Sequence, residues 1–317
     1  MKPVMVATWN FGVKAVSKGM EILLSGGSTL DAIEEGIKVV EDDLEVLSVG
    51  LGGLPNVEGE VELDASIMDG GTLRCGAVGA LKDIRHPISV ARKVMELTPH
   101  VLLVGEGALK FALRCGFKRE RFWKPGSREK WEEMLENLRK GKYEAESFYG
   151  RVWKAVRGLW KETVSAVALD AEGCMAAGNS TTGLFMKMPG RVGDSAVIGA
   201  GLYVDNRVGG AVTTGTGEVA INYCLSKRVC DLMASGLNPK EACEKAIAET
   251  LYRRNFDGGI AVLALNNKGE VGAAHSLKEF VYAYQDGGMD KPELIKAARV
   301  ASGSWQATLR HPTRFYI

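Results

Sequence analysis

A single threonine, Thr163, stands directly after the charged pair Lys161-Glu162 and directly before an apolar segment of residues 164–169. A threonine hydroxyl is a poor nucleophile, and one way to activate it is an adjacent free α-amine. That amine exists only if the chain is cut between Glu162 and Thr163. The segment therefore has two interpretations: an ordinary half-buried strand that begins with threonine, or a self-cleavage site whose new N-terminus is the nucleophile of a hydrolase.

A second group of residues with chemical potential is Arg191-Val192-Gly193-Asp194, which follows Pro189-Gly190 and is predicted to form a tight, irregular loop. A guanidinium binds a carboxylate through a forked pair of hydrogen bonds, and a carboxylate binds an ammonium group. Arg191 and Asp194 therefore match a zwitterionic ligand such as an amino acid. The alternative is a surface salt bridge, which would contribute little to stability.

The third group is the glycine-rich segment Thr213-Thr214-Gly215-Thr216-Gly217-Glu218. Glycines just before a helix let backbone N–H groups point at a phosphate or at a developing oxyanion. The phosphate interpretation is weak, because the segment lacks the GxxxxGK[ST] pattern. The oxyanion interpretation requires a nucleophile close by.

The elements that position these residues follow from the sequence pattern. The turn residues Asp170-Ala171-Glu172-Gly173 predict a hairpin that starts at Thr163. Antiparallel pairing then brings residues 179–181 roughly opposite Thr163, where their hydroxyl groups can hydrogen-bond its side chain.

Hydrophobic periodicity predicts the remaining elements, with Ser28 capping the second helix through Asp31. We expect strands at 4–8, 61–68, 75–80, 260–265 and 271–275, a glycine-rich β region at 196–216, and helices at 11–24, 28–40, 88–97, 107–115, 128–141, 219–234 and 239–253. Residues 142–162 are predicted to be a mobile connector, which a cleavage site needs beside it. Grouped strands and grouped helices favour layered sheets flanked by helices, an α+β fold.

Composition restricts the class of partner. Forty basic and thirty-nine acidic side chains leave a net charge of +1, which favours a small-molecule or peptide partner over nucleic acid or a membrane. The six cysteines form no CxxC pair, and the four histidines show no metal-ligand spacing, so we expect no metal and no disulfide framework. Without a recognisable signal peptide or membrane-length apolar run, the sequence indicates a cytoplasmic protein.

Several motifs, in order along the chain, resemble the N-terminal-nucleophile (Ntn) asparaginases, and most of all their glycosylasparaginase group. They are Thr8-Trp9-Asn10-Phe11-Gly12, the Thr163 segment, Ser180-Thr181-Thr182-Gly183, Pro189 to Ser195, Ile198-Gly199-Ala200-Gly201 and Thr214-Gly215-Thr216-Gly217-Glu218.

The resemblance implies one domain over residues 1–317 with a four-layer αββα sandwich of the Ntn-hydrolase type. It also implies self-cleavage into an α chain of residues 1–162 and a β chain of residues 163–317, a dimer of such αβ units, and no cofactor. The reaction implied is hydrolysis of the side-chain amide of an asparagine derivative through a threonyl-aspartyl ester, which releases aspartate.

The resemblance also assigns roles to individual residues. Thr163 is the nucleophile and its α-amine, with an unperturbed pKa of about 8, is the base. Arg191 binds the α-carboxylate of the substrate and Asp194 its α-ammonium, while Thr214 and the Gly215 N–H stabilise the oxyanion. Gly217 helps to seat the substrate, and Thr181 tunes the nucleophile. Trp9 forms a wall of the pocket, and Phe11 and Ser48 line its edge.

Three functions follow. The leading hypothesis is hydrolysis of glycosylasparagine-type amides; the second is an L-asparaginase or isoaspartyl peptidase that uses the same Thr163 machinery. The third is an uncleaved, non-enzymatic binding protein on the same fold.

This chain has Lys161-Glu162 where the family usually has His-Asp before the threonine, and Ser165 where it usually has glycine.

Overall fold

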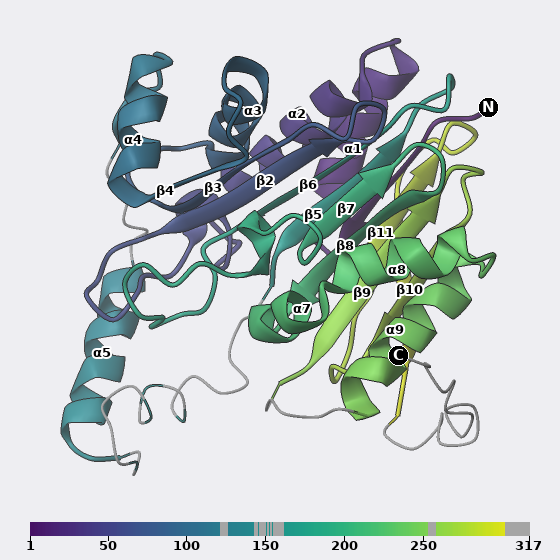
Figure 1. Ribbon diagram of the computed structural model, residues 1–317. Helices are drawn as coiled ribbons and strands as arrows, with labels where there is room; N and C mark the ends of the chain where they lie inside the picture. Colours follow the sequence, from purple (N-terminus) through teal and green to yellow (C-terminus); the bar gives the residue numbers. More distant parts are fainter. Residues whose placement is uncertain are drawn as a thin grey trace, which may run out of the picture.

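The structure is a computed structural model of the chain that describes residues 1–120, 126–142, 145, 150, 152, 154, 162–252 and 258–301. Most of the predicted connector 142–162 lies outside the described residues. The described part is a mixed α+β fold with two β-sheets (Figure 1).

The larger sheet has eight strands in the order β12-β11-β1-β5-β6-β2-β3-β4. Its neighbours are antiparallel except for β3 and β4. The strands are β1 (Val4–Thr8), β2 (Leu63–Asp69), β3 (Cys75–Leu81), β4 (Leu102–Val104), β5 (Val164–Leu169), β6 (Met175–Thr181), β11 (Val281–Asp286) and β12 (Glu293–Lys296). The strand that follows Thr163 therefore lies near the centre of this sheet, where it is buried on both faces.

The smaller sheet has five strands in the order β13-β10-β9-β8-β7. They are β7 (Leu202–Asp205), β8 (Gly209–Gly215), β9 (Ile260–Asn266), β10 (Val271–His275) and β13 (Ala298–Arg299). Apolar side chains of both sheets, among them Val6, Val167 and Leu263, form one buried cluster between the two sheets. The end of β8 that carries the glycine-rich segment is thereby placed against the larger sheet.

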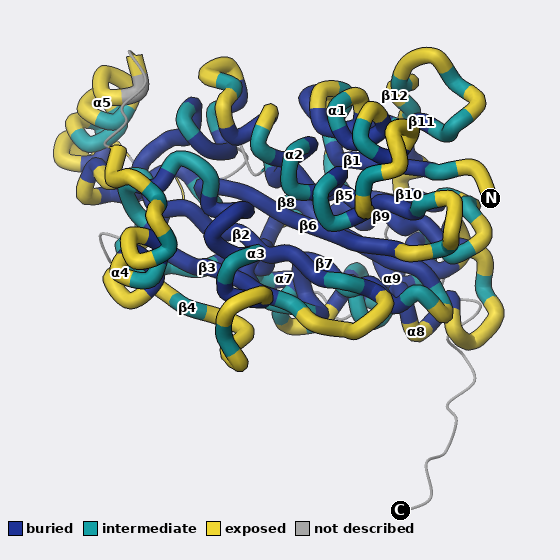
Figure 2. Tube along the Cα trace, turned by 90° about the horizontal axis from the view of Figure 1, so that it is seen from above, coloured by how far each residue is buried: buried dark blue, intermediate teal, exposed yellow. Residues whose placement is uncertain are grey.

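Helices cover the outer faces of both sheets (Figure 1). On the larger sheet lie α1 (Gly12–Leu24), α2 (Thr29–Glu41), α3 (Pro87–Leu97) and α4 (Gly105–Arg114); on the smaller sheet lie α8 (Leu225–Ala234) and α9 (Pro239–Tyr252), with α7 (Gly217–Tyr223) between α8 and the site described below. Seen from above, the buried strands form the middle of the molecule and the exposed turns its rim (Figure 2). Each helical layer contributes an apolar cluster of its own.

A further helix, α5 (Ser127–Arg139), belongs to the tryptophan-rich region that precedes the predicted cleavage site. Trp131, Met134, Leu135 and Leu138 recur at helical spacing, and they pack with Leu54, Val57, Phe185 and Met186. This face of α5 rests on the loops that lead into the Arg191 segment. Part of the excursion is therefore packed on the body of the protein.

The structure confirms the predicted cap at Ser28, whose hydroxyl oxygen accepts a hydrogen bond from the Asp31 backbone N–H at 3.1 Å. It corrects the single helix predicted over 219–234. That region is two helices, α7 and α8, which break at Cys224, where φ is +44°. Cysteine is not among the residues that favour a left-handed backbone, so this break has no local sequence signal.

Candidate active site

The predicted hairpin is confirmed, and it brings the Glu162-Thr163 junction next to the end of β6. Val164 pairs with Ser180 across β5 and β6, so Thr163 lies beside Thr181. Thr163 is 5% exposed. The threonine singled out by the sequence is therefore a buried residue that directly precedes β5, beside the end of β6.

The backbone of Thr163 is held on both sides by hydroxyl groups. Its N–H donates to Oγ1 of Thr214 at 3.1 Å, across the gap between the two sheets. Its carbonyl oxygen accepts from Oγ1 of Thr8 at 2.5 Å, and Thr8 in turn accepts from the Ser165 N–H at 3.0 Å. The atom that cleavage would turn into a free amine thus already lies against Thr214.

Thr214 has a second partner, because its Oγ1 also accepts from Nε1 of Trp9 at 2.9 Å. A hydroxyl group has two acceptor positions and one proton. Trp9 and Thr163 occupy both acceptor positions, so the proton of Thr214 is left to point elsewhere. Trp9 itself has φ of +65° and packs edge-on against Phe280, with ring centroids 5.2 Å apart.

The hydroxyl groups near Thr163 are distributed differently from the prediction. Oγ1 of Thr181 lies 3.3 Å from the Glu162 carbonyl oxygen and 3.1 Å from the Ser48 carbonyl oxygen. The Thr163 side chain instead accepts from Oγ of Ser195 at 3.5 Å. Thr181 therefore reaches the carbonyl of the bond predicted to break, and Ser195 reaches the predicted nucleophile. Phe11 packs in the apolar core beneath α1.

Glu162 is half-buried directly before the nucleophile. Burial raises the pKa of its carboxyl group above the ordinary value for glutamate. Loss of hydration disfavours the charged form, which is the cause of this shift.

The charged residues of the predicted zwitterion site bind other partners in this structure. Nε and Nη2 of Arg191 donate to Oε1 of Glu218 at 3.0 and 2.8 Å. Asp194 is buried, its Oδ2 accepts from the Thr213 hydroxyl at 2.7 Å, and burial raises the pKa of its carboxyl group. The alternative of a local surface salt bridge between Arg191 and Asp194 is thus not what the structure shows, because Arg191 is paired with Glu218, 27 positions away.

Glycines keep space open around these two charges. A Cβ atom on Gly183 or Gly193 would lie 3.1 or 2.6 Å from Nη1 of Arg191. A Cβ atom on Gly217 would lie 2.6 Å from Oδ1 of Asp194. Real Cβ atoms essentially never come within 3.0 Å, and 3.1 Å is already unusually close, so a side chain at any of these three positions would crowd Arg191 or Asp194.

Five of the predicted residues line one small cleft together with Gly183, Leu184 and Gly193; they are Thr163, Thr181, Arg191, Asp194 and Gly215. The cleft holds about 10 Å³, which is about the space of one water molecule. The uncut chain therefore brings the nucleophile and both charges together but leaves no room for an amino acid.

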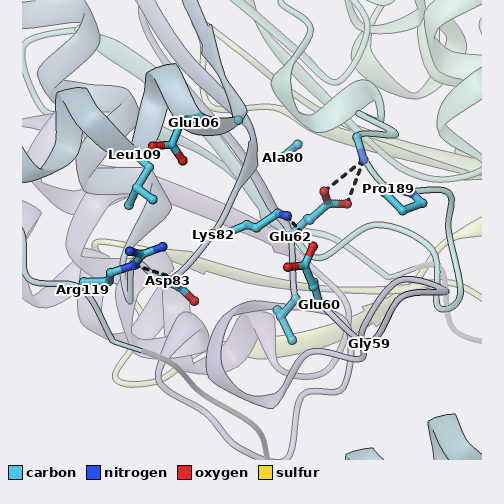
Figure 3. A pocket seen from close by; sticks show the side chains of 13 residues that line it. Gly59, Glu60, Glu62, Ala80, Lys82, Asp83, Glu106, Leu109, Arg119 and Pro189 are labelled. Carbon is cyan, nitrogen blue, oxygen red and sulfur yellow. Dashed lines mark hydrogen bonds and ion pairs between the residues drawn. The ribbon is translucent and has the colours of Figure 1, made fainter.

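A roomier cavity of about 610 Å³ uses the neighbouring residues Pro189 and Gly190 (Figure 3). Two ion pairs border it, Lys82 with Glu60 and Arg119 with Asp83. It contains neither Thr163 nor Asp194, so the small cleft, despite its size, is the better candidate for chemistry.

The structure also reveals partners to which sequence reasoning gave no role: Thr8, Ser195 and Glu218. All three lie inside motifs noted above, but only the fold shows that Thr8 and Ser195 contact Thr163 and that Glu218 contacts Arg191. A threonine at the end of a buried strand was the available signal for Thr8.

Within the described part of the chain, no three His, Cys, Asp or Glu side chains are grouped to hold a metal ion. None of the described helices is long and apolar enough to cross a membrane.

Comparison with known proteins places the chain in a family. The family described as asparaginase matches residues 6–294. An N(4)-(beta-N-acetylglucosaminyl)-L-asparaginase of Elizabethkingia miricola is 41% identical over 293 residues, covering 90% of this chain and 80% of the relative. A plant-type L-asparaginase of Pyrococcus abyssi is 44% identical, covering 85% and 87%. An isoaspartyl peptidase/L-asparaginase of Xenopus laevis is 39% identical, covering 87% and 86%. The chain therefore belongs to the asparaginase family, and it is an amidohydrolase.

Proposed function

We propose that the chain cuts itself between Glu162 and Thr163 and then hydrolyses the side-chain amide of an asparagine derivative. One observation carries this proposal: Thr163 lines a single cleft with the charges Arg191 and Asp194, and its N–H donates to Thr214. An N-terminal threonine hydrolase needs these parts within reach of one small substrate.

Self-cleavage begins with attack of the Thr163 hydroxyl on the Glu162 carbonyl carbon. The Glu162 carboxylate takes the hydroxyl proton, and the Thr181 hydroxyl stabilises the negative charge that develops on the Glu162 carbonyl oxygen. The C–N bond then breaks, Thr163 nitrogen receives the proton, and Glu162 is left as an ester on the Thr163 oxygen. Water hydrolyses that ester, which yields an α chain of residues 1–162 and a β chain of residues 163–317 with a free amine.

Cleavage also explains how a cleft of 10 Å³ becomes a substrate site. Departure of Glu162 removes the residue that precedes Thr163 and whose carbonyl lies against Thr181. Thr163 is then exposed from the side that Thr181 and Gly183 line. Arg191 keeps Nη1 beside two glycines, where the α-carboxylate of a substrate can approach, and Asp194 faces the α-ammonium.

Amide hydrolysis uses the same groups. The new amine of Thr163 takes the hydroxyl proton, the oxygen attacks the side-chain carbonyl carbon, and the proton passes to the departing amine. The Thr214 proton, left over by its two acceptor contacts, and the Gly215 N–H stabilise the oxyanion. Gly217 keeps the substrate against Asp194, and Trp9 fixes Thr214. Water then hydrolyses the aspartyl ester on Thr163 and releases aspartate.

The substrate we favour is a glycosylasparagine-type amide, in keeping with the name of the Elizabethkingia relative. The 44% identity to the plant-type L-asparaginase of Pyrococcus abyssi supports free asparagine or a β-aspartyl peptide as the alternative. Arg191 and Asp194 recognise the aspartyl part that these substrates share. We further propose that the two sheets and their helical layers form the four-layer αββα sandwich of Ntn hydrolases, and that αβ units pair as dimers.

Denaturing electrophoresis followed by N-terminal sequencing tests self-cleavage. We expect two bands, one of which begins at Thr163, and one intact band for Thr163→Ala. An intact wild-type band at several pH values would leave the non-enzymatic alternative. Aspartate release from glycosylasparagine, asparagine and a β-aspartyl dipeptide then ranks the substrates, and glycosylasparagine as the poorest of the three would refute the favoured assignment.

A further inference from the structure

Two buried carboxylates hold the backbone on either side of Arg191. Oε1 of Glu62 accepts from the Gly190 N–H at 3.0 Å, a contact visible beside Pro189 in Figure 3. Oδ2 of Asp64 accepts from the Gly193 N–H at 3.0 Å. Glu62 directly precedes β2 and Asp64 is its second residue, so one short stretch of chain anchors both ends of the Gly190–Gly193 segment.

Burial makes these two carboxylates expensive unless a positive charge compensates them. The side chains of Glu62 and Asp64 are 2% and 0% exposed. Nζ of Lys187 lies 4.0 Å from Oε2 of Glu62 and 4.0 Å from Oδ2 of Asp64, and it donates to the Glu62 carbonyl oxygen at 3.3 Å. The Lys187 side chain is 1% exposed. One ammonium group therefore lies between the two acids that hold the Arg191 segment.

Lys187 is itself fixed from two directions. Its carbonyl oxygen accepts from the Val57 N–H at 3.1 Å, and the preceding residue, Met186, donates its N–H to the Pro55 carbonyl oxygen. Met186 is fully buried with φ of +59°, a conformation that a bulky residue keeps only where its surroundings hold it. Nζ of Lys187 also lies 3.4 Å from where a Cβ atom on Gly183 would be, directly behind the cleft.

We propose that Lys187 is a positioning residue for substrate binding: its ammonium group balances Glu62 and Asp64, and thereby keeps the Gly190–Gly193 segment, with Arg191, in the place where it meets the α-carboxylate of the substrate. This inference rests on the proposed function of Arg191. Lys187 lies behind Gly183 and acts through the two acids. Replacing it leaves two like charges in a dry site, which favours movement of the segment that they hold.

The test compares Lys187→Met with wild type in the cleaved protein. Calorimetry gives the dissociation constants of L-aspartate, the proposed product, and of β-alanine, which is aspartate without the α-carboxylate. We expect at least tenfold weaker binding of L-aspartate and less than twofold change for β-alanine. The matched control is Lys82→Met, which removes a lysine near Glu62 that borders the 610 Å³ cavity and is paired with Glu60; its two constants should match wild type.

The other outcomes are decisive as well. Equal dissociation constants for wild type and Lys187→Met, or equally weakened binding of L-aspartate and β-alanine, would overturn the role of Lys187. Wild type that fails to cleave or to bind L-aspartate would instead refute the proposed function. If Lys187→Met does not fold or cleave, Lys187→Met/Glu62→Gln decides, since glutamine can still accept from Gly190 without a charge. L-aspartate binding within threefold of Glu62→Gln alone supports charge balance, and failure of the double variant to recover refutes it.

Discussion

Alanine at Gly217 tests whether Arg191 and Asp194 have the geometry that substrate binding requires. Gly217 is the first residue of α7. An added Cβ atom would lie 2.6 Å from Oδ1 of Asp194, 3.0 Å from Nη2 of Arg191 and 3.1 Å from the Asp194 backbone nitrogen. Since Cβ contacts below 3.0 Å essentially never occur, Asp194 must shift, and the shift disturbs both groups proposed to hold the substrate.

Overpacking of this kind costs about 1–3 kcal/mol. If that cost falls on the bound geometry of Asp194 and Arg191, affinity for the aspartyl part drops by roughly 5- to 150-fold. We expect KM for the amide substrate and the dissociation constant of L-aspartate to rise together within that range, while the cleaved enzyme retains most of its kcat.

Gly107→Ala is the matched control, because Gly107 lies in the first turn of α4 and an added Cβ atom there meets nothing within 4 Å. Alanine in a helix is favoured over glycine by up to about 1 kcal/mol, so this variant should be unchanged in activity and at least as stable. L-aspartate binding to Gly217→Ala within twofold of wild type would refute the assignment of Asp194 and Arg191 to the substrate.

Three further predictions concern the surroundings of Thr163. Thr8→Val leaves the buried Thr163 carbonyl and Ser165 N–H without their partner, which lowers the free energy of unfolding by about 2–5 kcal/mol. Thr8→Ser keeps the hydroxyl group and lowers it by about 1 kcal/mol. Urea unfolding of the uncut Thr163→Ala protein measures both variants, and equal losses of stability would contradict the contact. Burial raises the pKa of Glu162, and a base must be ionised, so the rate of self-cleavage should rise as pH increases through that raised pKa. Glu162→Gln should lose this pH dependence, and gel densitometry measures both rates. A wild-type rate that does not change with pH would count against Glu162 as base. Burial raises the pKa of Glu41, which accepts from the Ser180 hydroxyl, to about 8, against 4.5 as its ordinary value. The folded state then binds the extra proton, so the free energy of unfolding should fall by about 3.5 kcal/mol from pH 5 to pH 8. Glu41→Gln should remove that slope in urea unfolding, and an unchanged slope would show that other groups cause it.

The sequence by itself determined what depends on short stretches of chain. The β5–β6 hairpin follows from the apolar segment 164–169 and from the turn at Asp170, whose Oδ1 accepts from the Glu172 and Cys174 N–H groups. That hairpin alone places Thr181 beside the Glu162-Thr163 junction. The ordered motifs were enough to identify the asparaginase family, because each motif is a short stretch whose residues and place along the chain are visible without the fold.

Only the tertiary structure decided which distant groups meet. The partner of the Thr163 N–H is Thr214, on the other sheet, and that of its carbonyl is Thr8, 155 residues earlier. The contacts of Glu218 with Arg191 and of Lys187 with two acids likewise join separate parts of the chain. The Thr163–Thr214 contact forms because the apolar faces of the two sheets pack against each other and bring the ends of β5 and β8 together. Periodicity predicts that a strand is buried, but it does not state which side chain of another sheet will lie opposite.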